Sequence, residues 1–361
     1  MAMPLSDRIL MGPGPCNPYP EVAAAMASPM LGHLDPEFIA LLDETNARLR
    51  QVLRTENELT FPVSGTGSAG MEAAFVNFVH PGDVVVVGVN GVFGMRMCDV
   101  SERAGAEVVR VDFPWGQPVD AQTLLGAHPS PAIIALVHAE TSTGVRSDIH
   151  EIGAGKGDAL LLVDAVTSVA GIPFEMDAWG IDIVYSGTQK CIGVPPGLAP
   201  FSASARALDR LVPKPQSWYL DLNMIASYVT GGGARAYHHT APISMIQGLH
   251  AGLGAVLGEG LENAQARHAR CGQMVQEGLQ ELGFELFAAE GYRLPQLTTV
   301  WVPPGVDEAA IRSTLLQRHG LEIGGGLGEF AGQVWRVGCM GHTARDRNVT
   351  LLLGALREVL A

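Results

Sequence analysis

The sequence predicts an α/β fold in which a mainly parallel β-sheet lies between helices and is followed by a smaller α+β domain. The first observation is a series of short apolar runs with helical stretches between them, which is typical of parallel strands joined by helical crossovers. These runs are 84–87, 108–111, 133–137, 160–163 and 181–185. The second observation is the length of 361 residues, which suggests about two domains. A content of 47% apolar and 17% charged residues is typical of a compact globular protein.

The chain begins with an extended arm. The segment 11–20 reads MGPGPCNPYP, and its prolines and glycines exclude a helix there. We expect this segment to lie across a surface.

The pattern changes after residue 258. The elements expected there are a long helix at 259–282, strands near 284–287 and 298–302, a helix at 307–318 and a last helix after Asp346. We therefore divide the chain into an arm at 1–20, a large domain at 21–258 and a small domain at 259–361.

Charge and cysteine content exclude several classes of function. A formal net charge of -14 without clustered Lys or Arg argues against a surface for nucleic acid or anionic membrane. The five cysteines form no CxxC pair, so neither a zinc site nor a disulfide framework is supported. The N-terminus lacks the apolar core of a signal peptide, and no apolar run reaches the roughly 20 residues of a membrane span. We expect a cytoplasmic protein.

Lys190 is the most informative residue. It lies in the segment SGTQKCIGVPPGLAP, directly after a buried strand, where glycines and prolines form a stiff turn. A partly desolvated lysine can lose its proton and form a Schiff base. The alternative is an exposed, charged loop lysine.

Asp164 ends the apolar run before Lys190. A carboxylate at the end of a buried strand is costly unless it meets a cation, although Asp is also a common helix N-cap. Together the two residues have a chemical meaning. An aspartate that keeps a pyridinium nitrogen protonated and a lysine that forms a Schiff base are the two groups that a pyridoxal-phosphate site needs.

A glycine-rich turn at 65–70 precedes a helix that we expect to begin near Met71. Backbone N–H groups at a helix N-terminus form an anion site, most often for phosphate. The turn also spells GxGxxG, but the next strand, VVVVGVNG, lacks the acidic residue of an NAD site. A glycine-rich turn without a ligand remains an alternative.

Several other residues have a functional and a structural interpretation. Arg336 follows a strand-like run and could be a ligand arginine or an ordinary salt-bridged one. His238 and His239 suggest a metal, but neighbouring side chains of an extended chain point to opposite sides, so we expect no metal site. Cys191 lacks an accompanying base and is expected to be a packed residue. For 324–326 we expect a hinge or tight turn near the substrate entrance.

Motifs along nearly the whole chain resemble class V, fold-type I pyridoxal-phosphate aminotransferases, and within them the alanine–glyoxylate and serine–pyruvate (or serine–glyoxylate) group. The motifs are GPGP from Gly12, LGHLDPEF from Leu31, SGTGSAGMEAA from Ser64, NGVFG from Asn90, HAETSTGV from His138, VDAVTS from Val163, SGTQKCIGVPPG from Ser186, YHHTAP from Tyr237 and EIGGGLGEFAGQVWRVGCMG from Glu322.

The resemblance implies pyridoxal 5'-phosphate as the cofactor, with Lys190 as the Schiff-base lysine and Asp164 as the partner of the pyridinium nitrogen. Arg336 would bind the substrate carboxylate, and Gly14 would border the substrate. Thr141 would contact the cofactor ring or the substrate. The residues implied for the phosphate are Thr66, Gly67, Ser68 and Gln189 from one subunit, and Tyr237 and Thr240 from its partner in a homodimer. One residue departs from the family, since Phe93 stands where a tryptophan commonly stacks on the cofactor.

The expected activity is transfer of an amino group from alanine or serine to glyoxylate or pyruvate. Within the same fold, ureidoglycine or aminophosphonate transaminases are alternatives, although Tyr237 before the His-His-Thr run favours the alanine or serine type. A pyridoxal-phosphate lyase would need a mobile cysteine, and an NAD-binding dehydrogenase would not need Lys190. The sequence does not rank the donors or the acceptors.

Overall fold

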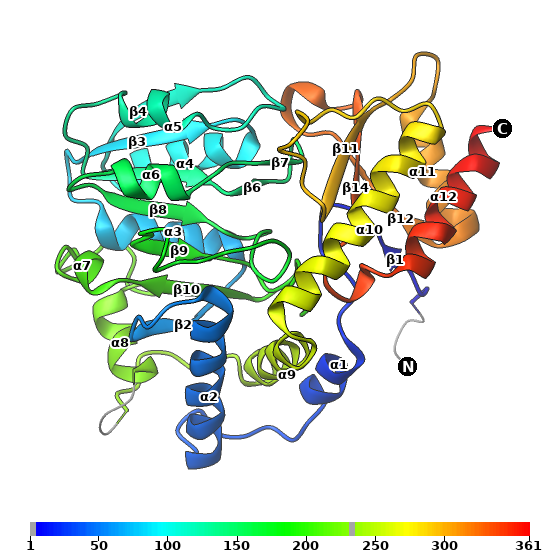
Figure 1. Cartoon of the computed structure of the whole chain (residues 1–361). Helices are drawn as coiled ribbons and strands as arrows, with labels where there is room; N and C mark the ends of the chain where they lie inside the picture. The colour runs from blue at the N-terminus through cyan, green and yellow to red at the C-terminus, as the bar shows by residue number, and fades with distance from the viewer. Residues whose placement is uncertain (1–4, 231–234) are drawn as a thin grey trace.

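The computed structural model describes residues 5–230 and 235–361, and its larger part is built on a seven-stranded sheet (Figure 1). The strand order is β2-β10-β9-β8-β5-β3-β4. All neighbouring pairs are parallel except those of β10, which runs antiparallel to both β2 and β9. The strands are β2 (Leu59–Ser64), β3 (Val84–Val89), β4 (Glu107–Asp112), β5 (Ile133–Val137), β8 (Leu160–Asp164), β9 (Ile183–Tyr185) and β10 (Leu198–Ala203). The predicted mainly parallel sheet is confirmed.

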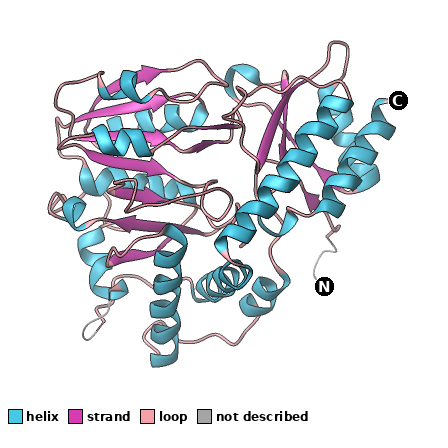
Figure 2. Cartoon of the chain, viewed as in Figure 1, coloured by secondary structure: helices cyan, strands magenta, loops and turns pink. Residues whose placement is uncertain are grey.

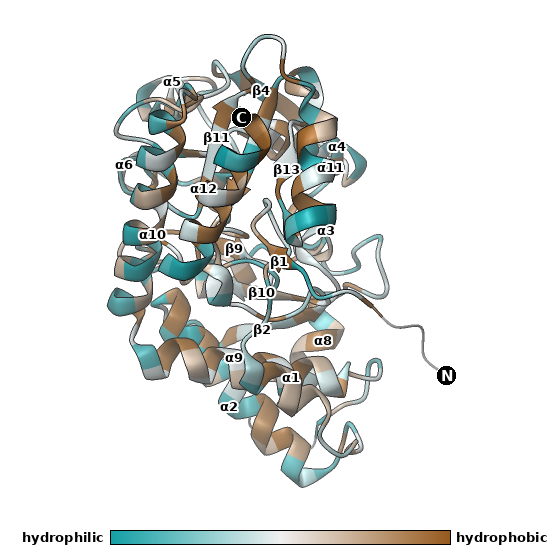
Figure 3. Cartoon of the chain, turned by 90° about the vertical axis from the view of Figure 1, so that its right-hand side faces the viewer, coloured by the Kyte–Doolittle hydropathy of each residue, from teal (hydrophilic) through white to brown (hydrophobic). Residues whose placement is uncertain are grey.

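Helices cover both faces of this sheet. The pair α3 (Gly67–Phe78) and α4 (Val92–Arg103) lies on one face, and the pair α5 (Ala121–Leu125) and α6 (His150–Gly155) lies on the other (Figures 1 and 3). Near the β2 and β10 edge lie α1 (Pro20–Met26), α2 (Pro36–Leu53), α7 (Ala205–Leu208), α8 (Leu222–Val229) and α9 (Ile243–Glu259). Helices on both faces bury the strands of this sheet except the edge strand β4, which explains the continuous apolar runs of the inner strands.

The C-terminal part is a second layered unit. Its three-stranded antiparallel sheet has the order β11-β14-β13, from Leu297–Trp301, Val334–Gly338 and Gly324–Gly325. Its helices are α10 (Leu261–Glu281), α11 (Glu308–His319) and α12 (Asp346–Leu360), with short 3-10 helices η1 (Gly328–Phe330) and η2 (Gly341–Thr343). Figure 3 shows apolar colour in its strands and hydrophilic colour on outer parts of α10 and α11.

Two hydrophobic cores accompany these two units. One surrounds the large sheet, and the other joins α10, α11 and α12 to the small sheet around the buried Trp335. Gly260, with φ 89°, separates α9 from α10 at the junction. The cores support the division into an arm, a large domain and a small domain, whose boundaries remain a proposal.

The sequence suggested that the arm lies across a surface, but several of its side chains are buried inside the molecule. Met11, Cys16 and Tyr19 are buried, because the arm runs between the two cores. Its strand β1 (Ile9–Leu10) pairs in parallel with β12 (Leu321–Glu322) of the small domain. Its later part bonds to the turn that carries Lys190, with Cys16 N donating to Gln189 O at 3.0 Å and Tyr19 N to Gly193 O at 3.2 Å. Residues 1–4 of the predicted arm lie outside the described residues.

Several predicted boundaries were wrong by a few residues. The helix expected from Met71 begins at Gly67, so the last two glycines of the GxGxxG motif belong to the helix. The expected helix 259–282 is α10, which starts after Gly260, because Glu259 still belongs to α9. The segment 284–287 forms only an isolated bridge from Leu286 to Val300 and no strand. The expected hinge at 324–326 is instead largely the short strand β13.

Two short strands, β6 (Ala139–Glu140) and β7 (Val145–Arg146), form a hairpin after β5. The loops after the parallel strands lie between the large sheet and the small domain (Figure 2). Within residues 5–230 and 235–361, no helix combines the length and the apolar character that a bilayer crossing requires.

Candidate active site

A pocket of about 570 Å³, including its open mouth, lies at the carboxyl ends of the parallel strands. Ligands of open α/β sheets bind at this edge. The pocket brings together most of the residues that the sequence singled out, although they are spread over 125 positions from Thr66 to Lys190. Its lining residues are Thr66, Gly67, Ser68, Met71, Phe93, Arg96, Val137, Ala139, Thr141, Asp164, Val166, Thr167, Tyr185, Gln189 and Lys190.

Lys190 follows β9 and is only 9% exposed. Its Nζ donates a hydrogen bond to the carbonyl oxygen of Pro13, so the arm touches the amine directly. Burial lowers the pKa of Lys190 to about 8, because the buried ammonium loses hydration. The predicted desolvated lysine is therefore present, and a large fraction of it is the neutral, nucleophilic amine near pH 8.

Gly14 borders the Lys190 side chain. A Cβ atom at Gly14 would lie 2.5 Å from Lys190 Nζ, and the backbone there has φ +110°, which side chains other than glycine rarely adopt. The predicted role beside the substrate is untested. The structure does place this glycine where any side chain would displace the amine.

Asp164 ends β8 and is 4% exposed. One carboxylate oxygen accepts a hydrogen bond from Val166 N, and the other accepts one from the Tyr185 hydroxyl, both at 2.8 Å. Burial raises the pKa of Asp164 to about 6, and these two bonds only partly offset the effect. The carboxyl is thus held in place, and within residues 5–230 and 235–361 it forms no ion pair, so the Lys190 charge opposes the effect of burial only weakly.

Thr66, Gly67 and Ser68 form the start of α3, directly after β2. Thr66 is the N-cap residue, and its side chain makes no capping hydrogen bond. A Cβ at Gly67 would lie 2.9 Å from Val166 Cγ2, so only glycine lets the helix approach the Asp164 loop this closely. Gln189 also faces the pocket, and its buried Oε1 has no hydrogen-bond partner in the described structure. This wall therefore offers free polar groups at a helix N-terminus.

Phe93 and Thr141 lie on the wall formed after β3 and β5. A buried carboxylate, Glu140, connects them, because it accepts bonds from Phe93 N at 3.1 Å and from Ser142 N at 2.9 Å. Burial raises the pKa of Glu140, while four hydrogen bonds oppose the shift. Glu140 fixes both loops, a role that the sequence analysis missed although it quoted the motif.

Arg336 reaches the site from β14 of the small domain and is 6% exposed. Its Nε donates to Gly325 O at 2.7 Å, and its Nη1 donates to Thr141 O at 3.1 Å. Nη2 has no acceptor in the described residues, and no carboxylate pairs with the guanidinium there. Burial lowers the pKa of Arg336 to about 10. A buried guanidinium with free donors suits a planar anion such as a carboxylate.

Tyr237 and Thr240 do not line the pocket of their own chain. Tyr237 is 57% exposed, and its hydroxyl lies 3.2 Å from Thr240 Oγ1. Their predicted contact with a neighbouring subunit is untested by a single chain.

Two of the structural interpretations can be checked. Cys191 is buried, its thiol donates to Thr167 O at 3.4 Å, and burial raises its pKa far above that of a reactive thiol. The packed residue is confirmed. The argument that His238 and His239 point apart was wrong, because their Nδ1 atoms are 2.7 Å apart.

Tyr185 and Arg96 are further pocket residues that the sequence analysis did not assign. Tyr185 ends β9 and holds Asp164 through its hydroxyl. Because Tyr185 lies in an apolar strand, the sequence predicted its burial but no functional role for it. Arg96 lies on α4, and its signal was its spacing of three residues from Phe93, which places both on one helix face.

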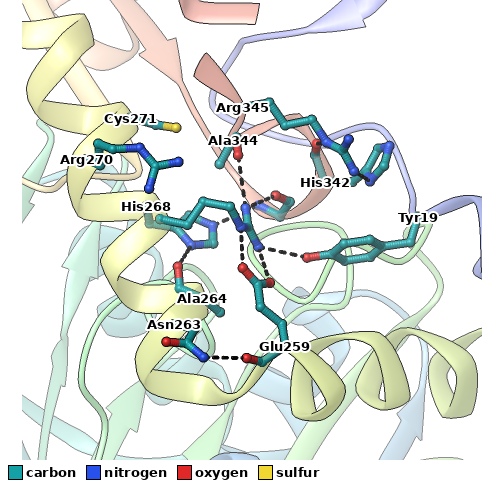
Figure 4. A network of polar contacts seen from close by, with 12 residues as sticks. Tyr19, Glu259, Asn263, Ala264, His268, Arg270, Cys271, His342, Ala344 and Arg345 are labelled. Carbon is teal, nitrogen blue, oxygen red and sulfur yellow. Dashed lines mark hydrogen bonds and ion pairs between the residues drawn. The ribbon is translucent and has the colours of Figure 1, made fainter. Parts of the chain in front are cut away.

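A second polar network joins the two domains and the arm at the junction of α9 and α10. Figure 4 shows the Glu259 carboxylate and the Tyr19 hydroxyl bonded to one guanidinium, that of Arg267. Arg267 donates from Nε and Nη2 to the two oxygens of Glu259, at 2.6 and 2.7 Å, and from Nη2 to Tyr19 at 3.1 Å. Its Nη1 donates to Gly341 O at 2.7 Å and Ala344 O at 3.0 Å. Gly341 packs against the Lys190 turn, so this network supports the site from behind.

The whole chain, with its mainly parallel sheet and its small C-terminal unit, superposes on solved aminotransferase structures, so its fold is that of the fold-type I transferases. Residues 16–334 match the family model described as aminotransferase class-V. The chain belongs to this family, and it is an aminotransferase, an enzyme that transfers amino groups.

Individual relatives agree over nearly the full length. A solved structure of an alanine–glyoxylate aminotransferase from Nostoc sp. is 46% identical, covers 100% of this chain and 97% of its own, and superposes with a TM-score of 0.97. The alanine–glyoxylate aminotransferase of Callithrix jacchus is 41% identical over 99% of this chain and 89% of its own length. The (S)-ureidoglycine–glyoxylate transaminase of Bacillus subtilis is 34% identical over 98% of this chain and 90% of its own length.

Proposed function

We propose that the enzyme uses pyridoxal 5'-phosphate to move the amino group of alanine or serine to glyoxylate or pyruvate. The observation that carries the proposal is the buried Lys190 amine, which shares one pocket with Asp164 and with the N-terminus of α3. The names of the relatives support glyoxylate as an acceptor, since glyoxylate occurs in all three.

The pocket residues fit this cofactor. Asp164 is a buried carboxyl that forms no ion pair in the described part of the chain, and a protonated ring nitrogen would be its partner. The start of α3 and the unpartnered Gln189 Oε1 offer free polar groups that could bind the phosphate. Thr66, Gly67, Ser68 and Gln189 would bind the phosphate, and Phe93 would offer its ring to the cofactor ring. When bound, pyridoxal phosphate supplies an electron sink for the charge that develops at the substrate Cα.

The chain's own residues would then share the work. Lys190 would hold the cofactor covalently, and once displaced by the substrate amine it would take the proton from the substrate Cα. Its lowered pKa favours the neutral amine that this step requires. Arg336 would bind the substrate carboxylate through the guanidinium edge that meets no acceptor in the described chain. Both half-reactions use an α-carboxylate, so one arginine serves both.

We also propose a cytoplasmic homodimer, in which Tyr237 and Thr240 complete the phosphate site of the partner subunit. The exposure of Tyr237 supports this proposal, since a monomer leaves a large apolar ring in water.

The relatives, the cysteines and the family membership also bear on the alternative functions. Transfer from ureidoglycine to glyoxylate is the second candidate, favoured by the relative of that name at 34% identity. No observation favours an aminophosphonate. A lyase with a mobile cysteine is disfavoured because all five cysteines are buried. Membership of the aminotransferase family excludes the alternative that the protein is an NAD-dependent dehydrogenase.

Steady-state kinetics with L-alanine, L-serine and ureidoglycine as donors, each with glyoxylate and pyruvate, test the proposal. We expect the highest kcat/KM for alanine or serine with glyoxylate. A kcat/KM for ureidoglycine that exceeds both by about 100-fold, a margin beyond a single methylene, would assign the second candidate instead.

A further inference from the structure

Arg96 is a pocket residue to which neither the motifs nor the family resemblance gave a role. It lies one turn into α4, and its guanidinium carbon is 4.9 Å from the centre of the Phe93 ring. Its Nη1 donates to Ser68 Oγ at 3.4 Å, across from the N-terminus of α3. Within residues 5–230 and 235–361, its guanidinium forms no ion pair with an acid, whereas Arg103 on the same helix pairs with Asp99 at 3.0 Å.

The charge balance of the pocket shows what Arg96 can do. The residues proposed for the phosphate are Thr66, Gly67, Ser68 and Gln189, with Tyr237 and Thr240 from the second subunit, and all of them are neutral. A phosphate monoester carries about −1.5 to −2 charges near neutral pH. Among the described residues that line the pocket, the cations are Lys190 and Arg96, and Asp164 adds a negative charge.

Lys190 does not supply the missing charge, because its amine lies at the Pro13 side of the pocket and would be used to hold the cofactor covalently. The protein as a whole, with a net charge of -14, repels an anionic ligand. A phosphate on the α3 N-terminus therefore needs a local cation, and Arg96 already touches Ser68 of that site.

We propose that Arg96 is the charge partner of the cofactor phosphate, placed by Ser68 and by the Phe93 ring. The inference rests on the proposed function. The aromatic face restricts the long side chain and weakens its hydration, so less entropy is lost when it binds the phosphate. A ring has two faces, so Phe93 can carry Arg96 on one and still offer the other to the cofactor.

The test compares two ligands that differ only in the phosphate. Dissociation constants of pyridoxal phosphate and of pyridoxal are measured by absorbance on the full-length enzyme freed of cofactor. The proteins are the wild type, Arg96→Met, Arg96→Lys and the control Arg103→Met, which removes the same charge two turns further along α4. Thermal unfolding of each variant checks its fold, and Arg96→Gln replaces Arg96→Met if that variant does not fold.

Arg96→Met should weaken binding of pyridoxal phosphate by about 10- to 100-fold and leave that of pyridoxal within about twofold, as expected for one charge-assisted hydrogen bond. Arg96→Lys should recover part of the loss, and Arg103→Met should match the wild type. Inorganic phosphate should compete with pyridoxal phosphate in the wild type and less in Arg96→Met.

An equal loss for both ligands, or no loss for either, would overturn the role of Arg96 while leaving the proposed function intact. A wild-type enzyme that binds neither ligand would instead overturn the proposed function, and this inference with it.

Discussion

The pocket and the domain junction both contain buried charges, but burial prevails in one and pairing in the other. Burial shifts the pKa values of Lys190 and Asp164 in the pocket, and of Arg336 beside Thr141, toward their neutral forms. At the junction, burial also acts to lower the pKa of Arg267, yet its bonds to Glu259 and Tyr19 outweigh it and raise the pKa. The bonds from Arg267 likewise lower the pKa of Glu259.

The two arginines make the difference concrete. Arg267 uses all five of its N–H donors, on Glu259, Tyr19, Gly341 and Ala344. Arg336 uses two, both on backbone carbonyls. A charge whose partners are all present stabilises the fold, whereas a buried charge without them leaves binding capacity for a ligand. Charges of the second kind therefore mark the site.

Replacing Arg336 should have the largest effect on activity. Arg336→Met is expected to lower kcat/KM by about 100- to 1000-fold, since a bidentate pair with a carboxylate contributes roughly 3 to 4 kcal/mol. Stability should change little, because the variant also removes the cost of burying the charge. Arg312→Met is the matched control, because Arg312 contacts Gly325 from α11 but pairs with Glu308. Steady-state kinetics that left kcat/KM of Arg336→Met unchanged would refute the difference between the two arginines.

Replacing Asp164 should stabilise the cofactor-free chain. Burial raises the pKa of Asp164 from 3.8 to about 6, so the folded state binds the proton more tightly than the unfolded state does. Stability is therefore lost as the pH rises from about 4 to about 6, by roughly 3 kcal/mol at neutral pH. Asp164→Asn should escape this loss while its transaminase activity falls steeply. Urea unfolding at pH 4 and pH 7 measures it, and equal stability of both proteins at pH 7 would contradict the assignment.

Replacing Glu259, the partner of Arg267 at the domain junction, should lower stability and leave substrate binding nearly unchanged. Glu259→Gln leaves the Arg267 charge without its carboxylate and is expected to cost about 2 kcal/mol of stability, less than for a fully buried pair because Glu259 is 29% exposed. KM should stay within about twofold, since no substrate contact is lost. The control Glu262→Gln alters the more exposed pair with Arg54 and should cost under about 1 kcal/mol. A large rise in KM for Glu259→Gln without loss of stability would count against this division.

Much of the large domain was predictable from the sequence because parallel strands covered on both faces are continuous apolar runs. The same topology makes the pocket predictable, because the residues after β2, β3, β5, β8 and β9 must meet at one edge of the sheet. That rule gathers Thr66, Phe93, Thr141, Asp164 and Lys190 without any knowledge of long-range packing.

Residues that depend on packing between distant segments escaped prediction. The burial of Met11 and Tyr19 depends on the small domain and the Lys190 turn, and neither can be inferred from the local Pro and Gly pattern. Glu140 received no role from its motif, because its backbone partners include Phe93, 47 positions away. His238 and His239 were judged by the geometry of a straight extended strand, which this segment does not adopt.

We propose that Lys190 holds the cofactor and moves the proton on which amino transfer in this pocket depends. The most direct measurement is the absorbance spectrum of the purified enzyme near the visible edge, before and after addition of L-alanine, for the wild type and for Lys190→Ala. The wild type should show the absorbance of lysine-bound pyridoxal phosphate, lose it on addition of the donor and regain it with glyoxylate, whereas Lys190→Ala should lack the lysine-bound spectrum and any turnover. A colourless wild type, or a Lys190→Ala variant that retains both the spectrum and the transamination, would contradict this role of Lys190.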